Sequence, residues 1–136
     1  MPQLADPPDR FAAARVARLA TLRPDGTPRL VPITFAVVDG LICSAVDAVK
    51  PKRTPWLARL VDIRSDPRVG LVVDEYDEDW THLWWARVDG RARIESPGST
   101  SAVAALRAKY PGYRDADLDG PMIVVTPQRW TGWSAR

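Results

Sequence analysis

The sequence predicts a mainly β domain of the α+β class, with six or seven antiparallel strands in a closed or nearly closed barrel and two or three short helices. Apolar and polar residues alternate along several segments, as they do in half-buried strands. Tight-turn sequences containing glycine separate most of these segments, which favours hairpins in series. The chain has neither a βαβ alternation nor a GxGxxG motif, which argues against a dinucleotide-binding fold. A barrel suits this pattern because it removes exposed sheet edges.

The first half of the chain is expected to form a helix and three strands. We expect the helix over 9–16 and the strands over 16–23, 28–38 and 41–46. Pro24-Asp25-Gly26-Thr27 is a turn sequence, because proline presets φ and glycine accepts the left-handed conformation. Asp39-Gly40 is a second turn of the same kind.

The second half is expected to contain two helices and the remaining strands. Thr54-Pro55 opens a helix, because a hydroxyl cap followed by proline is a typical start, and Asp66-Pro67 ends it. Its expected apolar side consists of Trp56, Leu57, Leu60, Val61 and Ile63. A strand over 69–76, a hairpin around Asp89-Gly90, a helix over 99–110 and a last strand over 122–133 follow. Pro127 marks a bulge or edge position in that last strand.

Length and composition limit the class of protein. The 136 residues fit one domain spanning 1–136, and 46% hydrophobic with 26% charged residues is typical of a soluble globular protein. No apolar run approaches the roughly 18 residues of a membrane-spanning helix. The opening MPQLADPPDR lacks the apolar region of a signal peptide, so we expect a cytoplasmic protein with no membrane partner. A net charge of +2 is too small to indicate nucleic-acid binding.

Metal and triad chemistry have few candidate residues. Cys43 is the only cysteine and His82 the only histidine, which argues against a disulfide, a metal enzyme and a Ser-His-Asp hydrolase. Cys43 is expected to be a buried strand thiol. The acidic run over 74–79 is interpreted as a solvated turn, with a divalent-cation site as the alternative. Such a run repels anions, so an anionic ligand is expected elsewhere.

The segment 50–55, KPKRTP, is the most informative candidate site. Lys50, Lys52 and Arg53 immediately precede a helix start, whose free backbone N–H groups carry partial positive charge. Together these groups would bind a phosphate or a carboxylate. The alternative is a solvated loop whose lysines promote solubility.

Two further features indicate a flat ligand or a partner. Pro32 lies within an expected strand and has no N–H to donate, which indicates an unpaired edge or, alternatively, a plain bulge. Trp84 and Trp85 are adjacent on a strand and therefore point to opposite faces. One can fill the core while the other lies outside, where a dimer partner or a ligand would cover it. Trp133 lies near the chain end, where an aromatic side chain suggests packing on a partner or a flat ring. Core packing is the interpretation favoured for most of the tryptophans, and at least one is expected to line an interface or pocket.

The motifs in their order resemble a known family. ARLATLRPDGTPRLVPITF, then the basic segment, then RLVDIRSDPRVGLVVDEY and WWARVDGRARIE resemble the pyridoxamine-phosphate-oxidase-like split β-barrel superfamily over roughly residues 10–133. The sequence is most similar to the actinobacterial branch described as probable coenzyme F-420 (deazaflavin)-dependent enzymes. The resemblance implies a homodimer with cofactor sites at the subunit interface.

The resemblance also implies roles for particular residues. The strand residues Arg29, Val31, Pro32, Ile33 and Thr34 would back the cofactor ring, Ser44 and Ala45 would lie near the cofactor chain, and Lys50, Lys52 and Arg53 would bind its phosphate. Trp85 stands where family members place a cofactor-contacting residue, often glutamine. Trp133 would approach the site from the partner subunit.

The implied function is hydride transfer from reduced coenzyme F-420 to a small conjugated substrate. Few acid or base residues are needed for this, because the cofactor ring performs the chemistry. Arg53, Arg59 and Arg64 would extend a cationic strip along the anionic tail of the deazaflavin, which favours it over FMN. The alternatives are an FMN-dependent oxidoreductase of the same fold and a non-enzymatic cofactor- or haem-binding protein, with His82 as the haem ligand.

Overall fold

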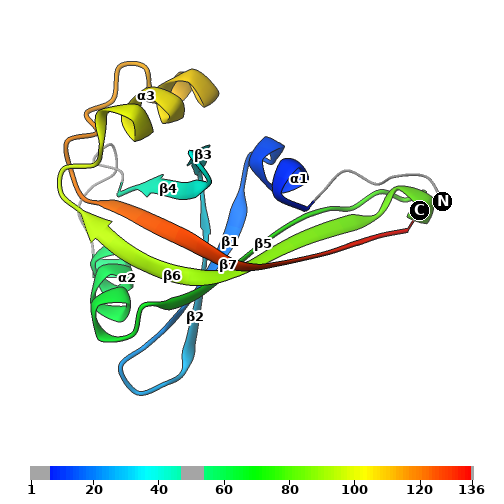
Figure 1. Ribbon diagram of the computed structural model, residues 1–136, viewed down its shortest axis with the longest axis horizontal. Coiled ribbons are helices and arrows are strands. Elements are labelled where there is room, and N and C mark those ends of the chain that lie inside the picture. The colour runs from blue at the N-terminus through cyan, green and yellow to red at the C-terminus, as the bar shows by residue number, and fades with distance from the viewer. Residues whose placement is uncertain (1–6, 47–53, 136) are drawn as a thin grey trace.

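The computed structural model describes residues 7–46 and 54–135, and it has an α+β fold built on one curled antiparallel sheet (Figure 1). Seven strands in these residues follow the order β2-β1-β5-β6-β7-β4-β3. The strands are β1 (Ala17–Leu22), β2 (Pro28–Ile33), β3 (Ala36–Val38), β4 (Leu41–Ala45), β5 (Arg68–Glu75), β6 (Trp84–Glu95) and β7 (Met122–Ser134). The helices are α1 (Pro7–Ala13), α2 (Thr54–Ser65) and α3 (Thr100–Lys109), with 3-10 turns at Trp80–His82 and Pro111–Tyr113. The predicted fold class is confirmed.

The two edge strands of the sheet are consecutive along the chain. β2 pairs with β1 and β3 pairs with β4, so Thr34 and Phe35 carry the chain from one edge of the curled sheet to the other. The prediction of one strand over 28–38 is therefore wrong. Phe35 and Ala36 are successive buried residues that belong to different core clusters.

The two predicted turns are present. At 24–27 the Arg23 N–H donates to the Thr27 carbonyl at 2.8 Å, and Gly26 has a φ of 87°. Asp39 and Gly40 have φ values of 52° and 79°. Two successive positive φ values are the signature of the tight hairpin turn that asparagine, aspartate and glycine favour.

The predicted hairpin at Asp89-Gly90 is wrong, because β6 runs unbroken through both residues (Figure 1). β6 pairs along its length with β7, and the register shifts between Asp89 and Gly90, opposite Pro127. A Cβ at position 90 would lie 2.5 Å from the Thr126 carbonyl oxygen. Glycine is therefore needed here for the close approach of two strands rather than for a turn, and Pro127 lies at a bulge as predicted.

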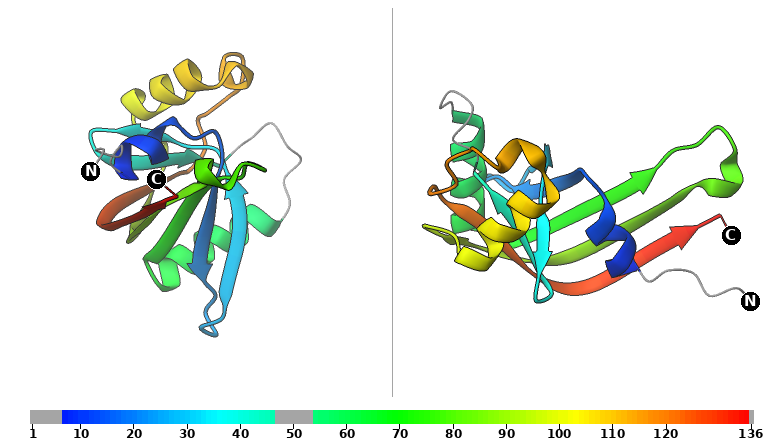
Figure 2. Two further views of the ribbon diagram at one scale, coloured as in Figure 1. Left: turned by 90° about the vertical axis from the view of Figure 1, so that its right-hand side faces the viewer. Right: turned by 90° about the horizontal axis from the view of Figure 1, so that it is seen from above.

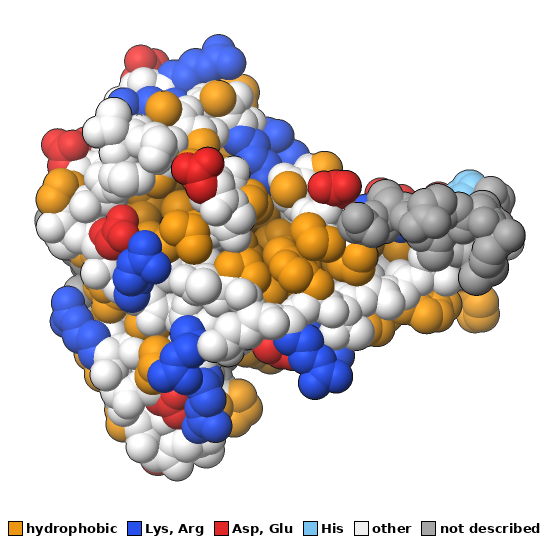
Figure 3. Space-filling view, viewed as in Figure 1, with side chains coloured by type: hydrophobic (Ala, Val, Ile, Leu, Met, Phe, Trp, Pro, Cys, Tyr) orange, Lys and Arg blue, Asp and Glu red, His pale blue; other side chains and the backbone are white. Residues whose placement is uncertain are grey.

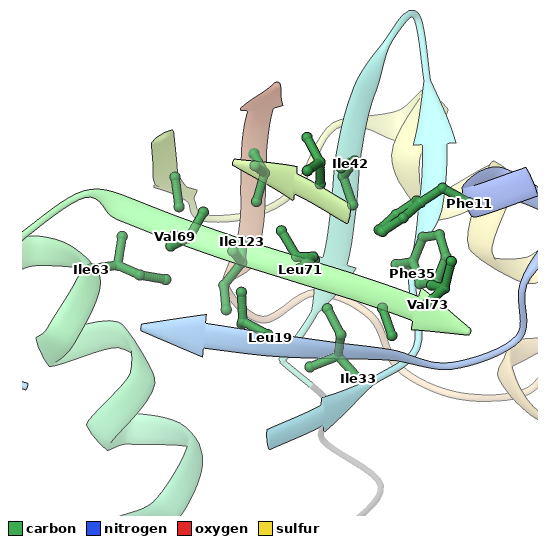
Figure 4. Packing of buried hydrophobic residues seen from close by; sticks show 14 of the residues in the cluster. Phe11, Leu19, Ile33, Phe35, Ile42, Ile63, Val69, Leu71, Val73 and Ile123 are labelled. Carbon is green, nitrogen blue, oxygen red and sulfur yellow. The ribbon is translucent and has the colours of Figure 1, made fainter. Parts of the chain in front are cut away.

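The core is enclosed by the sheet and by helices at its two ends (Figure 4). Ile63 from α2 points toward Val69 at one end, and Phe11 from α1 lies against Phe35 at the other, with ring centroids 4.8 Å apart. α3 covers a second cluster that includes Leu106, Met122 and the buried Cys43. The prediction of a buried strand thiol is confirmed.

The ends of β5, β6 and β7 form an arm, defined here as residues 74–85 and 131–135 (Figure 2). Its base packs on the core through Trp84, and the rest projects beyond the core. Its tip carries Tyr76 and Trp80, which are 65% and 68% exposed. None of the helices in the described part of the chain is long and apolar enough to cross a membrane.

Candidate functional site

β2 places the first group of predicted site residues at a sheet edge. Arg29, Val31 and Ile33 point toward the core side, whereas Leu30 and Pro32 point outward and are exposed. β2 is hydrogen-bonded to β1 on one side and ends the sheet on the other. β2 is therefore the edge strand that Pro32 predicted. An edge strand tolerates proline, which has no N–H to donate to a neighbouring strand.

The next predicted residues lie where the curled sheet is split. The Ser44 hydroxyl on β4 donates to the Thr34 carbonyl at 2.8 Å, and the Thr34 hydroxyl lies 2.6 Å from the Tyr113 hydroxyl. Ser44 is buried, and the half-buried Ala45 packs against the cluster beneath α3. The structure thus brings Thr34 and Ser44 together and ties both sheet edges to the segment after α3.

A buried carboxylate connects α2 to the same edge of the sheet. Asp62 is 1% exposed, and its Oδ2 accepts hydrogen bonds from the Thr21 hydroxyl and from Arg29 Nε, each at 2.7 Å. The Arg29 side chain keeps 25% of its surface exposed. Burying a carboxylate costs free energy unless the charge is paired. The two hydrogen bonds from Thr21 and Arg29 offset this cost for Asp62.

Arg59 adds a second cation, one turn closer to the start of α2. Burial lowers the pKa of its guanidinium below the ordinary value. Neither Arg59 Nε nor the second Asp62 oxygen, Oδ1, has a hydrogen-bond partner in the part of the chain that the structure describes, although both atoms are buried. Polar atoms left in this way are uncommon in folded proteins.

The predicted phosphate-binding residues precede this helix in the sequence. α2 begins at Thr54, as the hydroxyl and proline pattern predicts. Lys50, Lys52 and Arg53 lie outside the described residues.

Trp85 and Trp133 form the second group. They stand opposite each other on β6 and β7, on the outer face of the sheet, with the Arg87 guanidinium 5.1 Å from the Trp85 ring. Trp84 points the other way and packs on the core, so the predicted division between faces is confirmed. β1 and β5 lie between β6 and β2 in the sheet. Within one chain, the tryptophan pair is therefore separated from the β2 group.

His82 lies at the tip of the arm. Its Nδ1 is 3.2 Å from Asp77 Oδ2, and its Nε2 is 3.7 Å from Asp79 Oδ2. The described residues contain no group of three or more side chains arranged to hold a metal ion.

Sequence reasoning missed Asp62 and Thr21. The predicted apolar side of the helix included Val61, which is 51% exposed, while its neighbour Asp62 is buried. An acid inside the apolar run Leu60 to Ile63 was the available signal, because a carboxylate at a core-facing position needs a donor from another element.

Comparisons with known proteins identify the family. A family model described as pyridoxamine 5'-phosphate oxidase matches residues 9–134. No curated protein sequence matches the chain significantly.

Three solved structures illustrate the similarity of fold. A conserved hypothetical protein from Mycobacterium tuberculosis is 23% identical, with 100% of this chain and 91% of that chain covered and a TM-score of 0.74. An F420 reductase is 20% identical, with 96% and 98% covered and a TM-score of 0.67. The haem storage protein HutZ from Vibrio cholerae is 13% identical, with 93% and 90% covered and a TM-score of 0.67. These likenesses concern the fold, and the family match covers nearly the whole sequence: the chain belongs to the pyridoxamine 5'-phosphate oxidase family.

Proposed function

We propose that the protein is an oxidoreductase that binds coenzyme F-420 as a homodimer and passes a hydride from the reduced cofactor to a small conjugated substrate. The observation that carries this proposal is the gathering of cations along α2. Arg29 and Arg59 reach this region from the described chain, and the basic segment 50–53 leads into it. Family membership and the fold shared with an F420 reductase support the same class of chemistry.

The residues present fit an anionic, flat cofactor. A helix start offers free N–H groups, and half-buried arginines offer charge in surroundings that screen it less than water does. In this proposal Lys50, Lys52 and Arg53 hold the phosphate, while the β2 residues Arg29 to Thr34 lie beside the ring. Ser44 and Ala45 border the cofactor chain.

The partner subunit completes the site in this proposal. Trp133 is 48% exposed and is separated from β2 within its own chain, which suits a side chain that reaches the other subunit. Apolar side chains also gather across the middle of the face in Figure 3. Surface of this kind favours association with a second copy. Trp85, opposite Trp133, would support it from the same arm.

The chemistry supplied by the bound cofactor is two-electron hydride transfer at its ring. The protein contributes binding, orientation and exclusion of water. Arginines and backbone N–H groups hold the anionic arm in place, and the tryptophans shield the ring from solvent. The substrate also takes up a proton, which this proposal draws from solvent, so it assigns no proton-transfer role to a described residue.

The direct test is binding of coenzyme F-420 to the purified protein, followed by fluorescence polarisation, with FMN titrated in parallel. We expect saturable binding of the deazaflavin at micromolar concentrations and oxidation of the bound reduced cofactor by an acceptor in a panel of quinones and enones. Binding of FMN with no binding of F-420 would overturn the choice of cofactor, and binding of neither would overturn the function.

A haem-binding protein is the second candidate, and the fold shared with the haem storage protein HutZ is the observation that favours it. His82 would be its axial ligand, yet both ring nitrogens face carboxylates at an exposed tip. A haem titration of His82→Ala decides the matter: an absorption spectrum identical to that of the unmodified protein excludes this ligand.

A further inference from the structure

The Asp62 carboxylate joins α2 to the paired strands β1 and β2. It lies on α2 and accepts from Thr21 on β1 and from Arg29 on β2, through one oxygen. Of the acids whose burial the structure describes, Asp62 is the one that is fully buried. Such a group is expensive to keep, and apolar residues of similar size often replace it without loss of stability. Its presence therefore calls for a role beyond packing.

The ion pair with Asp62 engages the Nε side of the Arg29 guanidinium. Asp62 binds the Nε atom, which lies on the side of the guanidinium. Neither terminal nitrogen of Arg29 forms a hydrogen bond with any residue in the described ranges, and a quarter of the side chain remains exposed. An arginine fixed through Nε presents two parallel N–H donors at a set angle, the arrangement that binds phosphate and carboxylate oxygens in pairs.

Arg59 adds positive charge on the same side of α2 as Asp62. The two residues are three positions apart, so their side chains are neighbours on the helix surface. Asp62 is committed to Arg29, and Arg59 has no acidic partner in the described part of the chain. Among the described residues, Arg59 therefore adds a positive charge without an acidic partner near the middle of α2.

We infer that Asp62 is a positioning residue, which anchors Arg29 through Nε so that its two terminal nitrogens face the anionic arm of the cofactor. This inference rests on the proposed function. It adds a residue that does not itself meet the ligand, and it gives Arg29 the task of binding the arm in addition to lying beside the ring.

A positioning role and a purely electrostatic role of Asp62 predict opposite changes in the affinity for an anionic ligand when Asp62 is replaced. Asp62→Asn removes a negative charge close to the binding region, which by Coulomb attraction alone tightens the binding of an anion. If Asp62 acts by holding Arg29, the same substitution weakens that binding, because the guanidinium loses its fixed position. The sign of the change therefore separates the two roles.

The experiment measures the affinity of Asp62→Asn for coenzyme F-420, for FMN and for riboflavin, which lacks the phosphate, by fluorescence titration. We expect the Kd for the anionic ligand that the unmodified protein binds to rise about tenfold, the range of one charge-assisted contact. The Kd for riboflavin should change less than about twofold, because riboflavin has no anionic arm.

Thr21→Val is the matched control. Thr21 donates to the same Asp62 oxygen, but its loss leaves the Arg29 ion pair in place. This variant is expected to lower the melting temperature while its Kd for the anionic ligand stays within about twofold of the unmodified protein. A tenfold loss in this control as well would assign the effect to general loosening of the fold and overturn the inference.

The remaining outcomes are also decisive. Unchanged or tighter binding of the anionic ligand by Asp62→Asn, or an equal loss for FMN and riboflavin, overturns the positioning role and leaves the proposed function standing. If Asp62→Asn does not fold, Arg29→Lys is measured instead. Lysine keeps the charge, but its single ammonium group cannot both pair with Asp62 and present two parallel N–H donors to the ligand. A Kd equal to that of the unmodified protein overturns the inference. Failure of the unmodified protein to bind either anionic cofactor removes the proposed function itself.

Discussion

Lys109 shows how single residues hold the split in the sheet together. Its ammonium group donates to the carbonyl oxygens of Ala12 and Phe35 at 3.1 and 3.0 Å, and it lies 3.8 Å from the centroid of the Phe35 ring. Burial, and to a smaller extent the charge of Arg15, lower the pKa of Lys109 to about 8. The end of α3 is thereby fastened to α1 and to the link between β2 and β3.

The lowered pKa predicts a pH dependence of stability. In the unfolded chain a lysine titrates near about 10.4, so between about pH 8 and 10 the unfolded chain holds a proton that the folded protein has released. The free energy of unfolding should therefore rise with pH in this window. Urea titrations of the unmodified protein and of Lys109→Met at pH 7.5 and 9.5 measure the effect. The difference between the two proteins should shift in favour of the unmodified protein at the higher pH, and a constant difference would contradict the assignment.

Residue patterns in the sequence indicated charges but not their partners. Arg29 was recognisable as a strand residue next to Pro32, and the resemblance gave it a place beside a cofactor. Its anchor, Asp62, is 33 positions away on a helix. No local pattern joins two such residues, because the contact depends on how α2 packs against β1 and β2.

At the scale of secondary-structure elements, β6 shows that a turn sequence does not by itself produce a turn. Asp89-Gly90 resembles Asp39-Gly40 in sequence, yet only the second pair turns. The difference lies in the neighbours: β5 and β7 pair with β6 on both sides of Gly90, and glycine allows the close approach of Thr126. Long-range pairing outweighs a local turn preference of this size.

The close approach at Gly90 predicts the result of a substitution. Gly90→Ala places a Cβ against backbone that cannot easily yield, and overpacking of this kind costs about 1–3 kcal/mol of the free energy of unfolding. Gly112→Ala is the control, because nothing lies within 4 Å of its expected Cβ. Chemical denaturation of both variants measures the costs. Equal stability of the two variants would be inconsistent with this account of the bulge.

The start of α2 was predicted from sequence, because a capping hydroxyl and a proline are local signals.

We predict that Lys52→Ala combined with Arg53→Ala weakens cofactor binding at least tenfold, since each charge-assisted contact contributes roughly 1.5 to 3 kcal/mol. Equilibrium titration with F-420 provides the measurement. Arg114→Ala, an exposed cation after α3, should bind normally. The same loss of affinity in that control would indicate a general charge effect rather than a site.

At the scale of the whole molecule, the alternating strands and tight turns predicted the antiparallel, barrel-like class, although one of the predicted hairpins and one of the predicted strands were wrong. They did not show where the barrel splits, because the break at Thr34 and Phe35 depends on two core clusters that form from distant segments. They also did not show that the Trp85 and Trp133 pair projects on an arm away from β2. In the proposed function, a site divided in this way is completed between two molecules.

The first whole-molecule prediction is therefore a dimer. Light scattering coupled to size-exclusion chromatography should give twice the 15.1 kDa chain mass at micromolar concentration. A particle of the mass of one chain, with F-420 bound, would show that a single subunit makes the site.

Mixing two defective variants tests the central claim, a cofactor site shared between subunits, most directly. Trp133→Ala and Arg29→Lys should each bind F-420 poorly. After unfolding and refolding together, half of the dimers should contain one chain of each kind, and each of these has one site with an intact Arg29 and an intact partner Trp133. About a quarter of all sites should then recover the affinity of the unmodified protein, as twofold symmetry requires. A mixture that binds no better than the two variants measured separately would contradict the shared site.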